Sequence, residues 1–282
     1  MKPVFAFFGT SELSIYVLDA LKEQGFLPSI IVATRDMPQG RNLIITAPLT
    51  KIWAEKNGIP CIQPPKLDSA FTYKLQATSY QLFLVASYGK IIPKSILELP
   101  KHGTLNVHPS LLPKFRGPSP IQSQILADDK ECGVTIMQID EEMDHGPILN
   151  QEIVEITDWP PKASVLEETL GKEGGRLLAK TIPIWVSGKI SPQEQDHSQA
   201  TYTKKFEKGD GLIDFSLDSY QNFLKIRAFE GGPGTYFFAE HRGTKIRVKI
   251  ADAEHENGKL VLTRVIPEGK REMSYADFER NN

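Results

Sequence analysis

The sequence predicts an α/β fold in which a doubly wound, mostly parallel sheet is followed by a small β-rich domain. Short, continuously apolar runs alternate with stretches of helical periodicity through the first half of the chain, as in a sheet that helices cover on both faces. After about residue 186 the periodicity is lost, and it then returns as alternating strand patterns. These two observations indicate a larger domain, a linker and a smaller domain.

The predicted elements of the larger domain alternate between strand and helix. Apolar runs predict buried parallel strands at residues 4–9, 29–34, 59–64, 81–87 and 103–108. Amphipathic stretches between the first four of these runs predict helices at residues 12–25, 47–58 and 71–79. The series closes with antiparallel additions to the sheet at 133–139 and 147–156 and a helix at 164–185.

The domain boundaries are predicted at residues 1–186 for the larger domain, 187–203 for the linker and 204–282 for a reduced, barrel-like C-terminal domain. The linker "SGKISPQEQDHSQATYT" is polar and lacks periodicity. Strands of the small domain are predicted in "TYFFAE", "TKIRVKI" and "KLVLTRVI".

Charge and cysteine content narrow the class of protein. The net charge is -2 and the pI is about 6.3, so a nucleic-acid partner would be held by local basic patches and not by a global field. Cys61 and Cys132 form neither a disulfide framework nor a metal motif, which fits a reducing cytoplasm. The apolar run after Pro3 is too short for a signal sequence or a membrane span. We therefore expect a cytoplasmic protein with no metal and no membrane association.

The stretch "TLNVHPSLLPKFRG" contains the strongest candidate site. Because a strand alternates its side chains between two faces, Asn106 and His108 project in the same direction at the end of a buried strand. Pro109 and Pro113 cannot donate to a sheet ladder, so the strand must end there and continue as a stiff loop. In open parallel sheets this end of the strands is where ligands bind.

A second polar cluster, "QIDEEMDHGPIL", follows the strand predicted at 133–139. If this strand neighbours the one that ends at His108, Asp144 comes close to that histidine. An amide that donates to a developing oxyanion, an imidazole that moves a proton and a carboxylate that sets the imidazole's state would suit transfer of an acyl-type group. Taken alone, the same residues equally fit a strand end that caps backbone groups and a solvated acidic turn.

The sequence "LNVHPSLLPKFRGPSPIQSQIL", with "GVTIMQIDEEMDHGPIL" after it, resembles the formyltransferases that use 10-formyltetrahydrofolate. The resemblance extends through "FFGTSEL", "QGRN", "VASYGKIIP", "YTKKFEKGDGLIDFS", "IRAFEGGPGTYF" and "IPEGKREMSYADF", and so covers most of the chain in order. The flanking segments, including the small second domain, are most similar to the members that formylate methionyl initiator tRNA.

The resemblance implies a role for each of these segments. Three residues would be catalytic: Asn106, His108 and Asp144. The folate would be bound by Ser110, Leu111, Leu112, Pro113, Tyr88, Gly89, Ile91 and Asp140, with the backbone of residues 86–92 against the edge of the pterin. For the acceptor, we expect contacts from Arg41, Leu43, Arg116, Lys245 and Arg247, of which Leu43, Lys245 and Arg247 are expected from the sequence pattern and not from the resemblance. For Arg116, pairing with the acidic turn is an equal alternative.

Three departures from the family pattern concern the acceptor. The loop after "QGR", which is rich in lysine in family members, reads "GRNLIITAP" here, and the second domain is short. His145 follows Asp144 where a small hydroxyl residue is usual, and it is either an inert surface ring or a group that shifts the acid limb of activity. In "TKIRVKI", cations alternate with aliphatic residues, which places Lys245 and Arg247 on one strand face together with Lys249. This face either binds phosphates of the acceptor or is a solvated strand face whose cations deter edge pairing.

We therefore expect a monomeric enzyme that transfers the formyl group of 10-formyltetrahydrofolate to the amino group of methionyl initiator tRNA, for translation initiation. An amino-sugar nucleotide N-formyltransferase is the alternative enzyme. A folate- or RNA-binding paralogue without catalysis is the alternative of another class.

Overall fold

The computed structural model describes residues 2–39, 43–241 and 243–280. The chain forms two compact units, and each is interleaved in sequence with the other. The first unit comprises Met1–Gly117, Glu131–Glu155 and Glu167–Tyr202, and the second comprises Pro118–Lys130, Ile156–Leu166 and Thr203–Asn282. The second unit therefore includes two short segments from within the predicted larger domain, while the three predicted boundaries stay a prediction.

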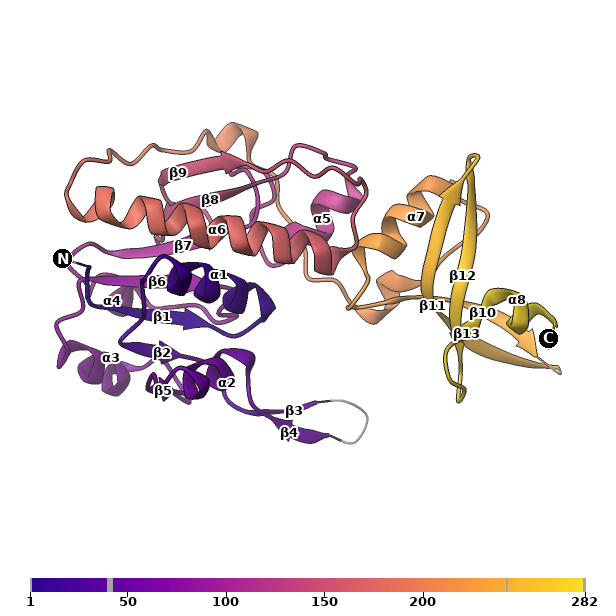
Figure 1. Cartoon of the computed structure of the whole chain (residues 1–282), viewed down its shortest axis with the longest axis horizontal. Coiled ribbons are helices and arrows are strands. Elements are labelled where there is room, and N and C mark those ends of the chain that lie inside the picture. Colours follow the sequence, from indigo (N-terminus) through magenta and orange to yellow (C-terminus); the bar gives the residue numbers. More distant parts are fainter. Residues whose placement is uncertain (1, 40–42, 242, 281–282) are drawn as a thin grey trace. The chain divides into compact units, whose positions relative to one another are not determined.

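A seven-stranded sheet forms the centre of the first unit, which confirms the predicted α/β class (Figure 1). Its strand order is β5-β2-β1-β6-β7-β8-β9. The first five strands in this order are parallel, and the last two are antiparallel additions, as predicted. The strands are β1 (Phe5–Gly9), β2 (Ile30–Val32), β5 (Cys61–Ile62), β6 (Leu82–Ala86), β7 (Thr104–His108), β8 (Gly133–Gln138) and β9 (Ile148–Ile153).

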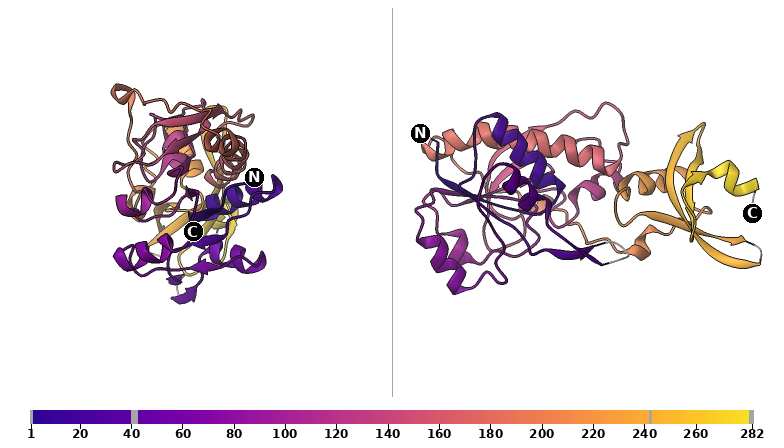
Figure 2. Two further views of the ribbon diagram at one scale, coloured as in Figure 1. Left: turned by 90° about the vertical axis from the view of Figure 1, so that its left-hand side faces the viewer. Right: turned by 60° about the horizontal axis from the view of Figure 1, so that its bottom comes forward.

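Helices cover both faces of this sheet, and the central strands β1 and β6 are fully buried (Figure 2). The helices are α1 (Glu12–Glu23), α2 (Leu49–Lys56), α3 (Ser69–Gln76), α4 (Lys94–Leu97) and α6 (Ala163–Val186). Helix α6 approaches β7 and α1 closely at two glycines: a Cβ at Gly174 would lie 2.5 Å from Val107, and one at Gly175 would lie 2.7 Å from Ala20. Helices α3 and α4 pack on the opposite face, against Ala6 and its neighbours.

The second unit is built on a four-stranded antiparallel sheet in the order β10-β11-β12-β13. Its strands are β10 (Thr235–His241), β11 (Thr244–Glu256), β12 (Lys259–Pro267) and β13 (Met273–Ser274), and its helices are α5 (Pro120–Leu126), α7 (Ser219–Ala228) and α8 (Tyr275–Arg280). Phe237, Val248 and Val265 lie at the centre of its core, together with Ile226 from α7 and Phe278 from α8. The three longest strands are those that the alternating patterns predict.

Several short elements were not predicted from the sequence. Residues Met37–Gln39 and Ile44–Thr46 form β3 and β4, a two-stranded antiparallel hairpin in the segment that was expected to be a loop. Helices α4, α5, α7 and α8 were also missed. In α4, α5 and α8, four, seven and six residues give too few turns for a clear helical period. No helix in the described part of the chain is long and apolar enough to cross a membrane.

Candidate active site

The end of β7 presents Asn106 and His108 on the same face of the sheet, as their spacing predicts. In the antiparallel register of β7 and β8, Asn106 lies opposite Met137 and His108 lies opposite Thr135. Val107, between them, points toward Gly174 of α6 on the other face. The His108 side chain is almost fully buried, and only 3% of its surface is exposed. The sheet thus fixes the position and direction of both polar side chains.

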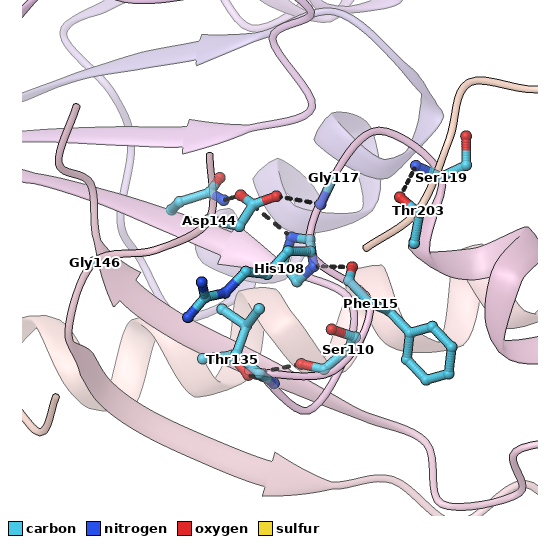
Figure 3. A network of polar contacts seen from close by, with 12 residues as sticks. His108, Ser110, Phe115, Gly117, Ser119, Thr135, Asp144, Gly146 and Thr203 are labelled. Carbon is cyan, nitrogen blue, oxygen red and sulfur yellow. Dashed lines mark hydrogen bonds and ion pairs between the residues drawn. The ribbon is translucent and has the colours of Figure 1, made fainter. Parts of the chain in front are cut away.

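Asp144, in the turn after β8, reaches these two side chains, and Figure 3 shows it beside His108 and Gly117. Its Oδ1 lies 3.6 Å from His108 Nδ1, and Asn106 Nδ2 donates to the same oxygen at 3.5 Å. Its Oδ2 accepts a hydrogen bond from the Gly117 backbone amide at 2.8 Å. The backbone of Asp144 is left-handed, with φ 51°, a conformation that is unfavourable for a residue with a side chain and is often found at functional sites. The three expected residues therefore converge in the structure.

The other ring nitrogen of His108 fixes the position of its proton. His108 Nε2 lies 3.0 Å from the carbonyl oxygen of Phe115, which can only accept a hydrogen bond, so Nε2 carries the hydrogen. Nδ1 is the ring nitrogen that faces the Asp144 carboxylate. The side chain is held from both sides in one orientation.

The loop after β7 is tied to the sheet by the Thr135 hydroxyl and the Gln151 amide. Thr135 Oγ1 donates to Ser110 O at 2.6 Å and accepts from the backbone amide of Leu112 at 3.1 Å. Gln151 Nε2 donates to Leu112 O at 2.9 Å and to Thr135 Oγ1 at 2.8 Å. Leu111 lies directly over Gly133, where a Cβ would be 2.4 Å from it. The sequence did not single out Thr135 or Gln151, since they lie on other strands.

The second group of predicted folate residues follows β6. Tyr88 is buried, which raises its pKa to about 12, and its backbone carbonyl accepts a hydrogen bond from Thr10 Oγ1. Gly89 is left-handed with open space around it, and the Ile91 side chain is 91% exposed. Asp140 accepts hydrogen bonds from the Glu142 amide at 2.9 Å and from His145 Nδ1 at 2.6 Å.

Arg116 has internal partners that differ from both alternatives expected for it. Only 1% of its surface is exposed, and its guanidinium donates to Gln195 Oε1, to His197 Nδ1 at 2.9 Å and to the Tyr202 hydroxyl at 3.4 Å. None of these partners belongs to the acidic turn. A contact between Arg116 and the acceptor stays a prediction. The guanidinium is buried here and is not exposed for such a contact.

Of the remaining acceptor candidates, Leu43 and Lys245 are exposed and Arg247 is half-buried. Leu43 begins the second half of the hairpin and is exposed, whereas Arg41 lies outside the described residues. On the second unit, Lys245 Nζ lies 4.6 Å from the ring centre of Phe238, and the Arg247 guanidinium lies 3.7 Å from that of Tyr236. These pairs alternate cations with aromatic rings on one face of β10 and β11.

A cavity of about 540 Å³ lies between the carboxyl ends of β1 and β2 and the hairpin. Its lining includes Thr10, Thr34, Met37, Thr46 and Ile52.

In the described part of the chain, His, Cys, Asp and Glu side chains form no group of three or more that could hold a metal ion.

Residues 1–182 match the family model described as formyl transferase. The fold and the paired polar strand end thus belong to a formyl transferase. Among curated proteins, the methionyl-tRNA formyltransferase of Herpetosiphon aurantiacus is 36% identical over 97% of this chain and 96% of its own length. That of Halalkalibacterium halodurans is 36% identical over 97% of this chain and 93% of its own length. The chain belongs to the methionyl-tRNA formyltransferase family.

Solved structures share the fold at lower identity. Methionyl-tRNA formyltransferase from Clostridium thermocellum has a TM-score of 0.64 at 17% identity and covers 94% of this chain and 98% of its own. An N-formyltransferase from Helicobacter canadensis, solved with folinic acid and dTDP-3-aminofucose, has a TM-score of 0.62 at 21% identity and covers 89% of this chain and 88% of its own.

Proposed function

We propose that this chain transfers the formyl group of 10-formyltetrahydrofolate to the α-amino group of methionyl initiator tRNA. The observation that carries the proposal is the convergence of Asn106, His108 and Asp144 at the end of β7, in a chain that matches methionyl-tRNA formyltransferases over almost their whole length. An amide donor, an imidazole and a carboxylate at one point are the groups that formyl transfer to an amine needs.

Each of the three side chains has a separate task in this reaction. Bound 10-formyltetrahydrofolate supplies the formyl carbon, which the amine attacks. Asn106 uses one amide hydrogen toward Asp144, and its second hydrogen is free to donate to the formyl oxygen as that oxygen gains negative charge. His108 Nδ1 and the Asp144 carboxylate share a proton path, through which the proton lost by the amine reaches the leaving nitrogen. A well-placed oxyanion donor alone contributes about two to three decades in turnover.

The folate is assigned to the two segments that flank β7 and β6. The segment after β6 offers irregular backbone around Gly89 and the exposed Ile91, which fit the polar edge and the apolar face of a flat ring system. Ser110, Leu111, Leu112 and Pro113 form a rigid wall, because Thr135 holds their backbone. Asp140 would contact the folate from the turn that also carries Asp144.

The acceptor tRNA is assigned to the hairpin and to the outer face of β10 and β11. In this proposal Leu43 packs against the unpaired end of the acceptor stem, and Lys245 and Arg247 contact phosphates. Cations interleaved with aromatic rings, here the exposed Phe238 and the half-buried Tyr236, are common in nucleic-acid sites, where the rings can also stack on bases.

The assay that tests the proposal compares two acceptors. Purified protein is given 10-formyltetrahydrofolate with either methionyl initiator tRNA or an amino-sugar nucleotide, and formylated product is measured. Formylation of the tRNA with a higher kcat/KM supports the proposal. Preference for the amino-sugar nucleotide would replace it with the alternative enzyme, and no product with either acceptor would favour a binding paralogue.

Two variant series separate catalysis from tRNA binding. Asn106→Ala, His108→Ala or Asp144→Ala should each lower turnover by about two to three decades, and near-normal turnover of Asp144→Ala would remove it from the mechanism.

Loss of two phosphate contacts in Lys245→Ala/Arg247→Ala should flatten the plot of log affinity against log salt by roughly one to two units. Lys259→Ala/Lys270→Ala removes the same charge from exposed positions outside β11 and serves as the control. An unchanged slope in the first variant means that the face contacts solvent only.

A further inference from the structure

Within the turn that carries Asp144, Asp140 accepts hydrogen bonds from the Glu142 amide and from His145 Nδ1, but these bonds do not involve the carbonyls of Asp144 and Gly146. Asp144 stands in a left-handed backbone conformation, and its side chain is aimed correctly only while that conformation is kept. The turn presses back onto β8 at Gly146, where a Cβ would lie 2.1 Å from Gln138 O. Contacts outside the turn must therefore hold the backbone on either side of Asp144.

Gln195 makes those contacts. Its Nε2 donates to Asp144 O at 3.0 Å and to Gly146 O at 2.7 Å, so a single amide group binds two carbonyls of the turn. The side chain comes from the segment that follows α6, 51 residues after Asp144, and only 5% of its surface is exposed. The part-buried carbonyl of Asp144 and the buried carbonyl of Gly146 would both lose their partner if this amide were removed.

Arg116 fixes the orientation of the Gln195 amide. Arg116 Nε and Nη2 donate to Gln195 Oε1 at 3.2 and 2.7 Å. A guanidinium cannot accept a hydrogen bond, so the amide oxygen must face Arg116 and the amide nitrogen must face the turn. All four hydrogen-bonding positions of the amide are then used. A glutamine is required here, because a carboxylate could not donate to the two carbonyls and an aliphatic side chain could bind neither side.

We propose that Gln195 is a positioning residue for the reaction, which holds the backbone of Asp144 so that its carboxylate reaches His108 and the Gly117 amide. This inference rests on the proposed function, since it acts through the role of Asp144 there. It assigns a task to the stretch "PQEQDHS", which the sequence marked only as a linker. Misplacement of a reacting group by about 1 Å can lower turnover by about two decades, whereas substrate binding need not change.

The experiment uses Gln195→Met, which keeps the length of the side chain and removes its hydrogen bonds. We expect kcat to fall about 10- to 100-fold, with KM for 10-formyltetrahydrofolate and for the acceptor changed by less than about threefold. Gln199→Met, the same substitution at an exposed position four residues later, should retain wild-type kinetics. Gln195→Glu, which still accepts from Arg116, should show the same kcat loss and serves if the methionine variant does not fold.

A double-mutant cycle tests whether Gln195 acts through Asp144. In an Asp144→Ala background, Gln195→Met should lower kcat by less than about threefold further, since the group that it positions is gone. An unchanged kcat in both Gln195 variants, or a full additional loss in the Asp144→Ala background, would overturn the proposal.

Amide hydrogen exchange gives a result that does not depend on catalysis. The Gly117 amide donates to Asp144 Oδ2, and its hydrogen should exchange faster in Gln195→Met than in the wild type. In Gln199→Met the exchange rate should equal that of the wild type. If Asp144→Ala itself keeps full turnover, the catalytic role in the proposed function fails, and the exchange rate still decides whether Gln195 holds the turn. A wild-type exchange rate at Gly117 in Gln195→Met would show that Gln195 does not hold the turn.

Discussion

Replacing Thr135 by valine removes the hydroxyl that ties the loop after β7 to β8 and leaves the shape of the side chain almost unchanged. Thr135 is fully buried, and its hydroxyl takes part in three hydrogen bonds. Gln151 retains its bond to Leu112 O in the variant, but Leu112 N and Ser110 O lose their partner. An unsatisfied buried polar group costs about 1–3 kcal/mol, so two of them predict a loss of about 2–6 kcal/mol in the free energy of unfolding.

The assay is urea unfolding at pH 7, with Thr104→Val as a matched control. Thr104 is equally buried in the neighbouring strand, and its hydroxyl makes one hydrogen bond, to Leu97 O at 2.8 Å. One unsatisfied carbonyl predicts a loss of about 1–3 kcal/mol. Thr135→Ser keeps the hydroxyl and distinguishes its loss from that of the methyl group. The slope of the unfolding free energy against urea concentration should be the same in all variants if only stability changes.

The same substitution connects the fold to the proposed folate site. Because Ser110 and Leu112 lose their anchor, Thr135→Val should also raise KM for 10-formyltetrahydrofolate, by about 10-fold for an effect of about 1.4 kcal/mol on binding. Thr104→Val should leave KM unchanged. Equal destabilisation by Thr135→Val and Thr104→Val, or a normal KM in the former, would show that the hydroxyl does not hold the loop.

Three further predictions concern titratable groups. Burial raises the pKa of Glu167 above its unfolded value, so the folded protein loses stability as the pH rises from the unfolded pKa of this group to its folded pKa. Glu167→Gln should therefore have a higher Tm than the wild type at pH 7, and the two Tm values should be equal below about pH 4. Burial raises the pKa of Cys61 to about 11, so a disulfide reagent at pH 8 should modify it far more slowly in the folded than in the denatured protein, and equal rates would contradict this. His145 donates to Asp140 and stacks on His197, so His145→Thr removes both contacts from the turn that carries Asp144 and should lower turnover, and an unchanged kcat would exclude such a role.

The sequence by itself was sufficient for the α/β class, the main strands of both units and the direction of the Asn106 and His108 side chains. These features depend on local geometry, because a strand alternates its faces every residue and a proline ends a ladder wherever it stands. The motif around His108 was also sufficient to recognise the formyltransferase family, which the comparisons confirm.

Only the tertiary structure decided what surrounds these two side chains. Asp144 meets His108 because β8 pairs with β7, and the partners of Arg116 and Thr135 are brought in by segments up to 86 residues away. No local period encodes such pairings, since they follow from the order of strands in the sheet and the path of the chain after α6. Gln195 therefore appeared as one polar residue of a linker in the sequence, whereas in the folded chain burial forces its amide to bind Arg116 on one side and the Asp144 turn on the other.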